Sequence, residues 1–316
     1  MNNAVIYNCG ISTVKFNFMS DVRIPNEFNL DRPYDYEASV YYIEPSVNRN
    51  MILDERIYAY IVQWANKASC SDDDREKLIS KTTENFMNFT CDGLFCKYMD
   101  RVLNTQEYNF NRVYDSFVFY KADLSDMVCF IGPYVKYMFE TGDYRSLTAL
   151  VMYTICRMNN YGLLHCSSVM KDGKAYIFSG PSGCGKSTVF NKLYNKADEL
   201  LNDELVLLRI DDKIQNVICA ATPISCSPSW SKIAGMWYPV SNIFMLKHDE
   251  YLHIDDMNIG EKISTLYHEM YGRAYMVISS NDNALYEFNL SYDIVSKCNI
   301  HSLFFALNSD LDEAIF

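Results

Sequence analysis

The N-terminal part of the sequence alternates apolar and polar side chains over short segments that end at turn-forming residues. Apolar side chains at every second position are typical of strands with one buried face. The predicted strands are 4–8, 14–18, 36–44, 56–64, 115–123 and 126–132. The charged segment 71–89 predicts a helix, with Asp72 to Asp74 at its N-terminus, where carboxylates interact favourably with the helix dipole. This pattern predicts a smaller N-terminal domain that is mainly β.

The hydrophobic pattern changes to helical spacing after residue 133. Leu147, Leu150, Val151 and Ile155 recur at the spacing of one helix face, and Asn159 stands where a helix would end. Because this helix leads into a different pattern, we place a domain boundary before it. The predicted domains are 1–133, with strands and a helix and a predicted role in recognising a substrate or partner, and 134–316.

The second predicted domain begins with two strands and continues with mixed elements. Strands at 163–170 and 174–179 flank Lys171-Asp172-Gly173, a tight-turn sequence that predicts a β-hairpin. The other predicted elements are a hairpin of 242–248 and 251–256, a turn at Asp255 and Asp256, a helix at 260–272, and strands at 274–279 and 300–308.

Composition narrows the class of protein. Of the 316 residues, 49% are hydrophobic and 22% charged, which is typical of globular domains. The net charge of −12 argues against a general nucleic-acid binder, which needs a basic face. The 11 cysteines form no CxxC pair, and the first residues lack the pattern of an export signal. The longest apolar run, 147–156, is too short to span a bilayer. These features predict a cytoplasmic protein without a membrane or nucleic-acid partner.

Residues 180–187, GPSGCGKS, follow the pattern of a P-loop and stand between a predicted strand and a predicted helix. Glycines let the backbone curl so that successive N–H groups point at a phosphate, and the following helix adds its positive end. Lys186 supplies charge for the β- and γ-phosphates, and the hydroxyl of Ser187 can bind Mg²⁺. The predicted nucleotide-binding residues are Gly180, Pro181, Ser182, Gly183, Cys184, Gly185, Lys186, Ser187 and Thr188.

Cys184 has two interpretations within this loop. It is interpreted as a small loop residue. Because a thiolate gains stability at a helix N-terminus, oxidation of Cys184 could alternatively inhibit nucleotide binding.

An acidic pair follows the loop closely in the sequence. Asp203 and Glu204 interrupt the apolar run 199–209, and carboxylates beside a P-loop can hold Mg²⁺ and accept the proton of a hydroxyl. The short distance between Lys186 and Asp203 disfavours an ABC-type ATPase, whose signature sequence is also missing. The absence of arginine between Arg209 and Arg273 disfavours a nucleoside monophosphate kinase.

Residues 163–209 resemble the kinase domain of the HPr kinase family, because the LLHCSSV segment, the P-loop and the LLNDELVLL segment occur in the family's order. A weaker likeness extends to ATPISCS at 221–227. The resemblance implies an α/β (α+β) chain: a P-loop kinase domain of the HPr kinase/PEP carboxykinase type with a mixed central sheet, behind the smaller N-terminal domain. It also implies binding of ATP or GTP with Mg²⁺.

The resemblance also suggests roles for individual residues. His165 would lie near the phosphates, although taken alone it could be a histidine of the core. Asp203 would act as the base, and Ser187, Asp203 and Glu204 would serve the metal, with Lys186 and His165 completing the catalytic set. Glu204 stands where the family has a second aspartate, and this change leaves reduced or absent turnover open.

The phosphate acceptor is the least defined part of the prediction. The EIRGLG-type segment of HPr kinases does not occur in 205–260, so HPr is not the expected substrate. Shorter relatives of this kind resemble proteins encoded with ribosomally made, modified peptides, which implies a serine of a peptide or protein as acceptor. Two alternatives stay open: a non-catalytic nucleotide-binding adaptor that docks a peptide or a modifying enzyme, and dephosphorylation at the same site. The sequence does not set the oligomeric state.

Overall fold

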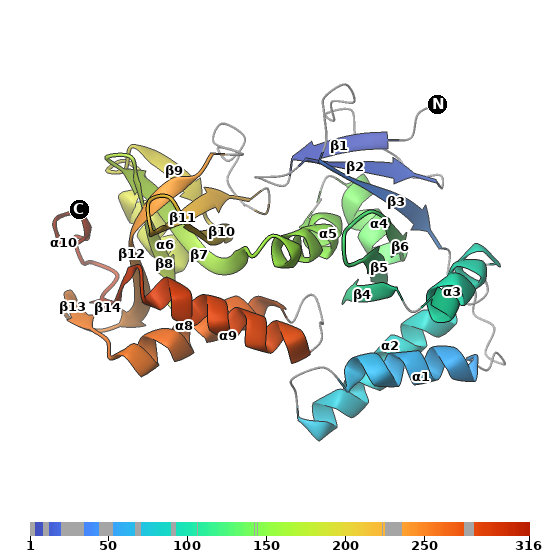
Figure 1. Cartoon of the computed structure of the whole chain (residues 1–316). Coiled ribbons are helices and arrows are strands. Elements are labelled where there is room, and N and C mark those ends of the chain that lie inside the picture. The colour runs from blue at the N-terminus through green and yellow to red at the C-terminus, as the bar shows by residue number, and fades with distance from the viewer. Residues whose placement is uncertain are drawn as a thin grey trace. The chain divides into compact units, whose positions relative to one another are not determined.

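Two compact units make up the chain, and each has its own β-sheet (Figure 1). The computed structural model describes residues 4–8, 13–19, 35–43, 53–66, 71–89, 93–105, 107–141, 143, 145–222, 224, 236–274 and 281–316. Of the described residues, those in 4–7, 13–158 and 281–284 belong to the first unit, and Asn8 and those in 159–274 and 285–316 belong to the second. The fold is mixed α/β, and both sheets contain parallel and antiparallel pairs.

The first unit has a six-stranded sheet in the order β1-β2-β3-β6-β5-β4. Its strands are β1 (Ala4–Asn8), β2 (Thr13–Phe18), β3 (Tyr36–Tyr42), β4 (Tyr108–Val113), β5 (Ser116–Lys121) and β6 (Met127–Ile131). Its helices are α1 (Glu55–Ala65), α2 (Asp72–Phe89), α3 (Gly93–Thr105), α4 (Pro133–Glu140) and α5 (Arg145–Met158). The pairs β2/β3 and β3/β6 are parallel, whereas β4/β5 and β5/β6 are antiparallel.

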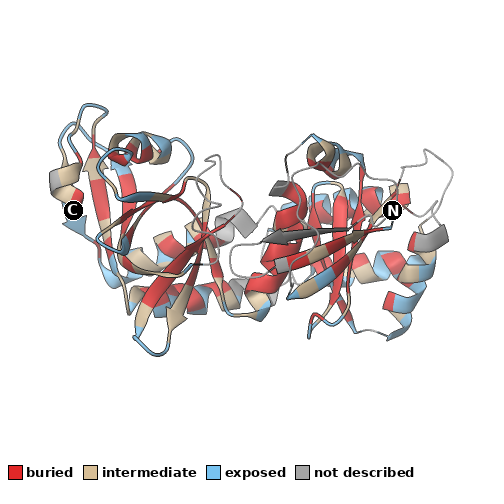
Figure 2. Cartoon of the chain, turned by 90° about the horizontal axis from the view of Figure 1, so that it is seen from above, coloured by how far each residue is buried: buried red, intermediate tan, exposed pale blue. Residues whose placement is uncertain are grey.

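Aromatic side chains fill the core between this sheet and helices α1 to α3. Phe117 and Phe119 of β5 are fully buried in the same cluster as Phe86 of α2 and Phe95 of α3. The Phe86 and Phe117 rings lie 4.4 Å apart in an edge-to-face arrangement, which aromatic rings prefer to a face-to-face stack. Buried residues follow the strands and the sheet-facing sides of the helices (Figure 2).

The segment 56–64, predicted as a strand, is a helix. Its β-branched and aromatic residues suggested a strand, but Ile57, Ile61 and Trp64 lie at helical spacing and are all buried on one face. Asp54 caps this helix, since its carboxylate accepts a hydrogen bond from the backbone N–H of Arg56 at 2.8 Å. With α3 also unpredicted, the first unit is mixed α/β and not mainly β.

The helical segment predicted within 134–159 is a pair of helices, α4 and α5, that belongs to the first unit. The unit boundary therefore falls after Met158, whereas the sequence suggested residue 133. The reason is packing on the first sheet. The Phe139 ring of α4 contacts the Phe18 ring of β2 at 4.9 Å, and the Asn111 amide of β4 donates to the Thr154 hydroxyl of α5 at 2.7 Å.

The second unit has an eight-stranded mixed sheet in the order β11-β10-β7-β8-β12-β14-β13, with β9 paired to β7. Its strands are β7 (Gly162–Lys171), β8 (Lys174–Ser179), β9 (Glu199–Asn202), β10 (Leu205–Asp211), β11 (Asn216–Ala221), β12 (Tyr238–His248), β13 (His253–Asp256) and β14 (Asn299–Phe305). Its helices are α6 (Lys186–Leu193), α8 (Ile259–Ala274), α9 (Asn281–Val295) and α10 (Asp312–Ile315). The predicted hairpin is formed by β7 and β8, and Asp172 and Gly173 adopt positive φ in its turn.

Strand alternation divides the second core between two clusters. Ile177 of β8 packs in the cluster that includes Leu266 of α8 and Ile294 of α9. Phe178, the next residue, packs with Val189 of α6 and Phe305 of β14. Because neighbouring strand residues point to opposite faces, α6 lies on one face of the sheet, and α8 and α9 lie on the other.

In the second unit, a predicted hairpin and a predicted turn are not formed, and two further predicted segments lie largely outside the described residues. The segments 242–248 and 251–256 do not form a hairpin, because β14 lies between β12 and β13 and pairs with both. Asp255 and Asp256 lie in strand β13 and not in a turn. The segment 274–279 lies outside the described residues except for Ala274, which ends α8, and most of 221–227 lies outside them as well. In the described part of the chain, no helix is long and apolar enough to cross a bilayer.

Candidate functional site

The loop 180–187 connects β8 to α6 at the carboxyl ends of three neighbouring parallel strands. Strand β12 is parallel to both β8 and β14, and Met245 of β12 is in register with Ser179, the last residue of β8. The residues that follow Met245 therefore extend beside the loop. The carboxyl edge of parallel strands is the place where open α/β sheets bind ligands.

Three glycines give the loop its curvature. Gly180, Gly183 and Gly185 have φ values of 145°, 84° and 101°, which L-residues with a side chain rarely adopt. A Cβ atom at Gly185 would lie 2.7 Å from the ring of Phe305, so this position also requires a missing side chain. At Gly183 the corresponding space is open for 4 Å. The loop thus packs closely on the sheet at one glycine and leaves room at another.

Helix α6 begins at Lys186, directly after the loop. Gly185 is its N-cap in the left-handed conformation and provides no side-chain cap. The first N–H groups of a helix have no partner inside it, and they carry the positive end of the helix dipole. Ser187 is exposed at this end and Thr188 is half-buried, while Pro181 and Ser182 are exposed on the loop. This end of α6 is therefore suited to an anion.

The side chain of Lys186 turns back over the loop. Its Nζ donates to the carbonyl oxygens of Gly180 at 2.6 Å and Pro181 at 3.0 Å. From the opposite side, the Ser167 hydroxyl donates to the Lys186 carbonyl at 2.9 Å and ties the start of α6 to β7. One positive charge is thus held against the main chain of the loop.

The sheet brings His165 next to the start of the loop and to the acidic pair. Cys166 of β7 is in register with Ser179 on one side, and His165 is in register with Leu205 on the other. The Ser179 hydroxyl donates to the His165 carbonyl at 2.7 Å. His165 is buried, and its Nε2 lies 3.9 Å from a carboxylate oxygen of Glu204.

Asp203 and Glu204 form the turn between β9 and β10. Both are partly exposed, so a ligand at this edge could reach them. The Cys166 N–H donates to the Glu204 carbonyl at 3.0 Å, which fixes this turn to the strand that carries His165. The predicted site residues of the loop, of β7 and of this turn therefore belong to adjacent strands of one sheet.

Asn202 holds the acidic turn and was not among the predicted residues. It is 1% exposed, and its side-chain oxygen accepts from the N–H groups of Glu204 at 2.7 Å and Leu205 at 2.9 Å. Its amide donates to the Thr222 carbonyl at 2.9 Å. An asparagine that precedes two acidic residues at the end of an apolar run is a known turn signal, so the sequence did contain a clue.

His248 is a second residue beside the loop that was not among the predicted site residues. It lies at the end of β12, and its Nε2 is 3.1 Å from the Gly183 carbonyl. A carbonyl only accepts, so this ring nitrogen carries the proton in this contact. His248 thus fixes the orientation of the peptide group at the open part of the loop. No sequence signal marks it, because its position depends on the pairing of β12 with β8.

Cys184 does not have the environment that the oxidation hypothesis requires. It is 8% exposed, and burial raises the pKa of its thiol, although the nearby Lys186 partly opposes this effect. A protonated, buried thiol reacts slowly. The interpretation as a small loop residue fits better, since Cys184 packs in the α6 cluster.

The loop and the acidic turn together offer groups that suit a nucleotide and Mg²⁺. The loop offers main-chain N–H groups, one ammonium group and open space at Gly183, all of which suit a phosphate chain. Ser187, Asp203 and Glu204 offer the oxygen ligands that Mg²⁺ prefers. In the described residues, no three His, Cys, Asp or Glu side chains gather into a metal-binding group by themselves.

The sequence matches no protein-family model and no curated protein. Among solved structures, the chain is similar to the Hpr(Ser) kinase/phosphatase from Coxiella burnetii, with 10% sequence identity and a TM-score of 0.25. The match covers 46% of this chain and 86% of that protein. A similarity of this size carries no argument about the function of the chain.

Proposed function

We propose that this protein binds ATP or GTP with Mg²⁺ at the loop 180–188 and transfers the γ-phosphoryl group to a hydroxyl, with a serine of a peptide or protein as acceptor. The observation that carries the proposal is the form of the loop: three glycines at positive φ, followed by a helix N-terminus, with Lys186 folded over the same turn. This combination supplies N–H groups and positive charge to a phosphate chain.

The roles of the surrounding residues follow from their chemistry. Lys186 would exchange its two carbonyl contacts for phosphate oxygens, and Ser187 would bind the metal. Asp203 would accept the proton of the attacking hydroxyl, and Glu204 would support the metal. His165, beside Glu204, would orient that carboxylate. When bound, Mg²⁺ neutralises charge on the transferred phosphoryl group.

Labelled nucleotide tests this proposal directly. Full-length protein is incubated with γ-labelled ATP and a panel of serine-containing peptides, and nucleotide binding is measured separately by calorimetry. We expect Lys186→Ala to lose nucleotide binding and Asp203→Asn to retain binding but lose transfer. Asp212→Asn is the matched control, because Asp212 is exposed in the β10–β11 turn, and it should change neither property.

Two results would contradict the proposal in different ways. Nucleotide binding that survives in Lys186→Ala would exclude the loop as the binding site. Transfer that survives in Asp203→Asn would remove Asp203 as the base while leaving the loop in place. Binding without transfer across a broad acceptor panel would support the alternative, a nucleotide-binding adaptor. The resemblance to HPr kinases favours that alternative in one respect, since Glu204 stands where the family has a second aspartate.

A further inference from the structure

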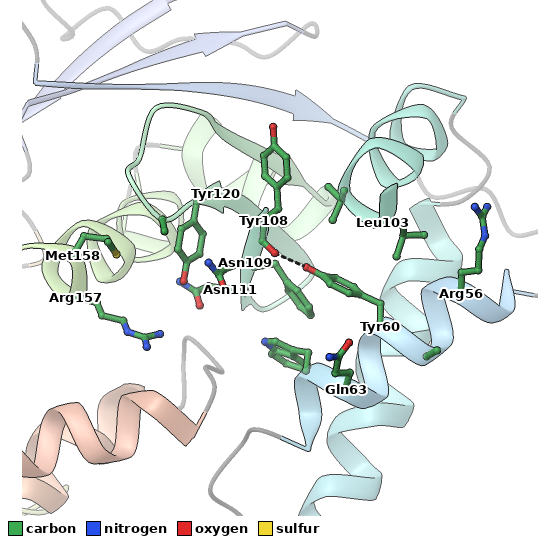
Figure 3. Close-up of a pocket in the computed structure, with 15 residues that line it drawn as sticks. Arg56, Tyr60, Gln63, Leu103, Tyr108, Asn109, Asn111, Tyr120, Arg157 and Met158 are labelled. Atoms are coloured by element: carbon green, nitrogen blue, oxygen red, sulfur yellow. Dashed lines mark hydrogen bonds between the residues drawn. The ribbon is translucent and has the colours of Figure 1, made fainter. Parts of the chain in front are cut away.

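The first unit contains a cavity of about 680 Å³ at the outer edge of its sheet (Figure 3). Strand β4 is the last strand in the described sheet, so one of its edges is not paired with another strand. Phe110 and Asn111 are neighbours on β4 and point to opposite faces of the sheet, yet both line the cavity. The cavity therefore passes around the unpaired edge, with α1 on one side and the end of α5 on the other.

One wall of the cavity is aromatic. The Trp64 ring of α1 stacks on the Phe110 ring of β4 at 4.4 Å, and the Tyr60 ring lies 5.5 Å from Phe110. The Tyr60 hydroxyl donates to the Tyr108 carbonyl at 3.1 Å, so this carbonyl of β4 faces α1 and not β5. Main-chain groups alternate in direction along an antiparallel strand, so those of Phe110 also face the cavity side.

Two arginines line the cavity, and they differ in their ion pairs. Arg56 forms ion pairs with Asp54 at 2.7 Å and with Asp100 at 3.0 Å. Arg157 is half-buried, and while burial raises the pKa of the Tyr120 hydroxyl, the nearby Arg157 guanidinium partly opposes that rise. None of the ion pairs between described residues involves Arg157. Figure 3 shows Arg157 on the α5 side of the cavity, across from Gln63 of α1. Arg157 is thus a cation at the cavity that has no acidic partner among the described residues.

A buried donor provides a second, independent observation. Trp64 is only 8% exposed, it lines the cavity, and its indole N–H has no hydrogen-bond partner among the described residues. Leaving a buried donor unpaired is unfavourable, so native structures usually satisfy it with a ligand or water. An unpaired N–H donor, a guanidinium without an acidic partner among the described residues, and flat aromatic walls together suit a ligand with a carboxylate and an apolar body.

We propose that this cavity binds a peptide segment in which a carboxylate lies next to a bulky apolar residue. The guanidinium of Arg157 donates to the carboxylate, the apolar side chain packs on Trp64 and Phe110, and the segment's backbone meets the unpaired edge of β4. The edge strand favours a peptide over a small organic acid, and the volume matches a few residues. The identification of this peptide as the phosphoryl acceptor rests on the proposed function; the binding of the peptide does not.

The test uses blocked pentapeptides and full-length protein without nucleotide. The first probe has adjacent phenylalanine and glutamate with both ends blocked, and the second replaces the glutamate with glutamine. A third has glutamine in the middle and ends in phenylalanine with a free C-terminus, so that a side-chain carboxylate can be distinguished from a terminal one. Binding is measured by calorimetry. We expect at least one carboxylate probe to bind about ten-fold more tightly than the glutamine probe.

Variants assign the binding to the cavity. We expect Arg157→Gln to weaken the carboxylate probe about ten-fold and to leave the glutamine probe unchanged, because only the charged contact is lost. Lys77→Gln removes the same charge from an exposed position on α2 and should change the affinity less than two-fold. If Arg157→Gln does not fold, Trp64→Phe replaces the indole with a smaller aromatic ring that has no N–H donor, and it should weaken both carboxylate and glutamine probes.

Four outcomes would overturn the proposal. The first is no binding of any probe at millimolar concentration, the second is equal affinity for carboxylate and amide, and the third is full affinity in both Arg157→Gln and Trp64→Phe. The fourth is displacement of the peptide by ATP in the Lys186→Ala variant, because it would assign the cavity to a nucleotide. Peptide binding without phosphoryl transfer would end the kinase proposal alone, whereas phosphoryl transfer that is unchanged in Arg157→Gln would end only the identification of the bound peptide as the acceptor.

Discussion

The two sheets of this protein have cores of different chemistry. In the first unit, large rings from three helices and three strands fill the space, including the fully buried Phe86, Phe95, Phe117 and Phe130. In the second unit, the buried residues of the larger cluster are aliphatic or sulfur-containing, and they include small side chains such as Ala175, Cys166 and Val206. Rings bury much area per residue but keep backbones apart, whereas small residues let elements approach closely.

This difference fits the two kinds of site that we propose. The loop of the second unit would bind its ligand mainly through main-chain N–H groups. It packs against the sheet at Gly185, where even one methyl group would meet Phe305. The cavity of the first unit would bind its ligand through side chains. Two rings of the aromatic core, Trp64 and Phe110, line it. The comparison predicts that the two units respond to different substitutions.

The largest effect is expected for a ring in the first core. Phe86 is fully buried and lies within 6.2 Å, centre to centre, of the rings of Phe95, Phe110, Phe117 and Phe119. We expect Phe86→Ala to lower the free energy of unfolding of the first unit by about 3–5 kcal/mol, since it removes a ring and leaves a cavity. Thermal unfolding monitored by calorimetry measures the loss.

The same variant tests whether the units are independent. Nucleotide affinity at the loop should stay within about two-fold of the wild type at a temperature where Phe86→Ala is still folded. Phe86→Leu is the milder control, and it should lose less stability because it leaves a smaller cavity. If nucleotide binding and first-unit stability fell together, nucleotide binding would depend on the core of the first unit, and the two units would not be independent.

The second largest effect is expected at the loop. Gly185→Ala combines a φ of 101° with a Cβ placed 2.7 Å from Phe305, so we expect it to destabilise the second unit by about 2–4 kcal/mol and to abolish nucleotide binding. Gly173→Ala is the matched control. Gly173 has a φ of 72° but nothing within 4 Å, so only the backbone strain of about 1 kcal/mol remains. Equal losses in both variants would show that packing on Phe305 does not matter.

Local patterns predicted the loop and its neighbouring hairpin, because both depend on signals within a few residues. Glycines at positive φ, the turn at Asp172 and Gly173, and a strand before a helix are all encoded locally. The segment 56–64 was misassigned because its composition favours strand while its spacing favours helix, and the cap Asp54 was overlooked. The period of the buried residues was the better guide.

Long-range pairing could not be predicted from the sequence. Strand β14 is inserted between β12 and β13, although it follows both in the chain, and this arrangement placed Asp255 and Asp256 in a strand. The contact of His248 with Gly183 likewise depends on the parallel pairing of β12 with β8. The edge position of β4, which creates the cavity of the first unit, depends on the order of the whole sheet. Such features arise from tertiary packing and leave no short motif.

An intermediate effect is expected at the acidic turn. Asn202→Ala would leave the N–H groups of Glu204 and Leu205 and the carbonyl of Thr222 without their side-chain partner, which should cost about 1–3 kcal/mol. If Asp203 is the base, the rate of phosphoryl transfer should fall more than the affinity for nucleotide. The reason is that the variant shifts the turn that carries Asp203 but leaves the loop 180–187 in place. Asn195→Ala, at an exposed turn, is the control and should stay within about 0.5 kcal/mol of the wild type. Unchanged transfer in Asn202→Ala would argue that the turn takes no part in the reaction.

The smallest expected effect is a difference in alkylation rate between two buried thiols, one in each unit. Burial raises the pKa of Cys129 and of Cys184, but Lys186 opposes the shift only at Cys184. Only the thiolate reacts with iodoacetamide, and a higher pKa means less thiolate at a given pH, so alkylation of both should be slow at pH 7 and should accelerate as the pH rises. Peptide mapping should find Cys184 modified before Cys129, and Lys186→Met should slow Cys184 further, because its pKa rises once the ammonium group is gone. Fast modification of Cys184 at pH 7 would show that the loop opens more readily than its packing against α6 and the sheet implies.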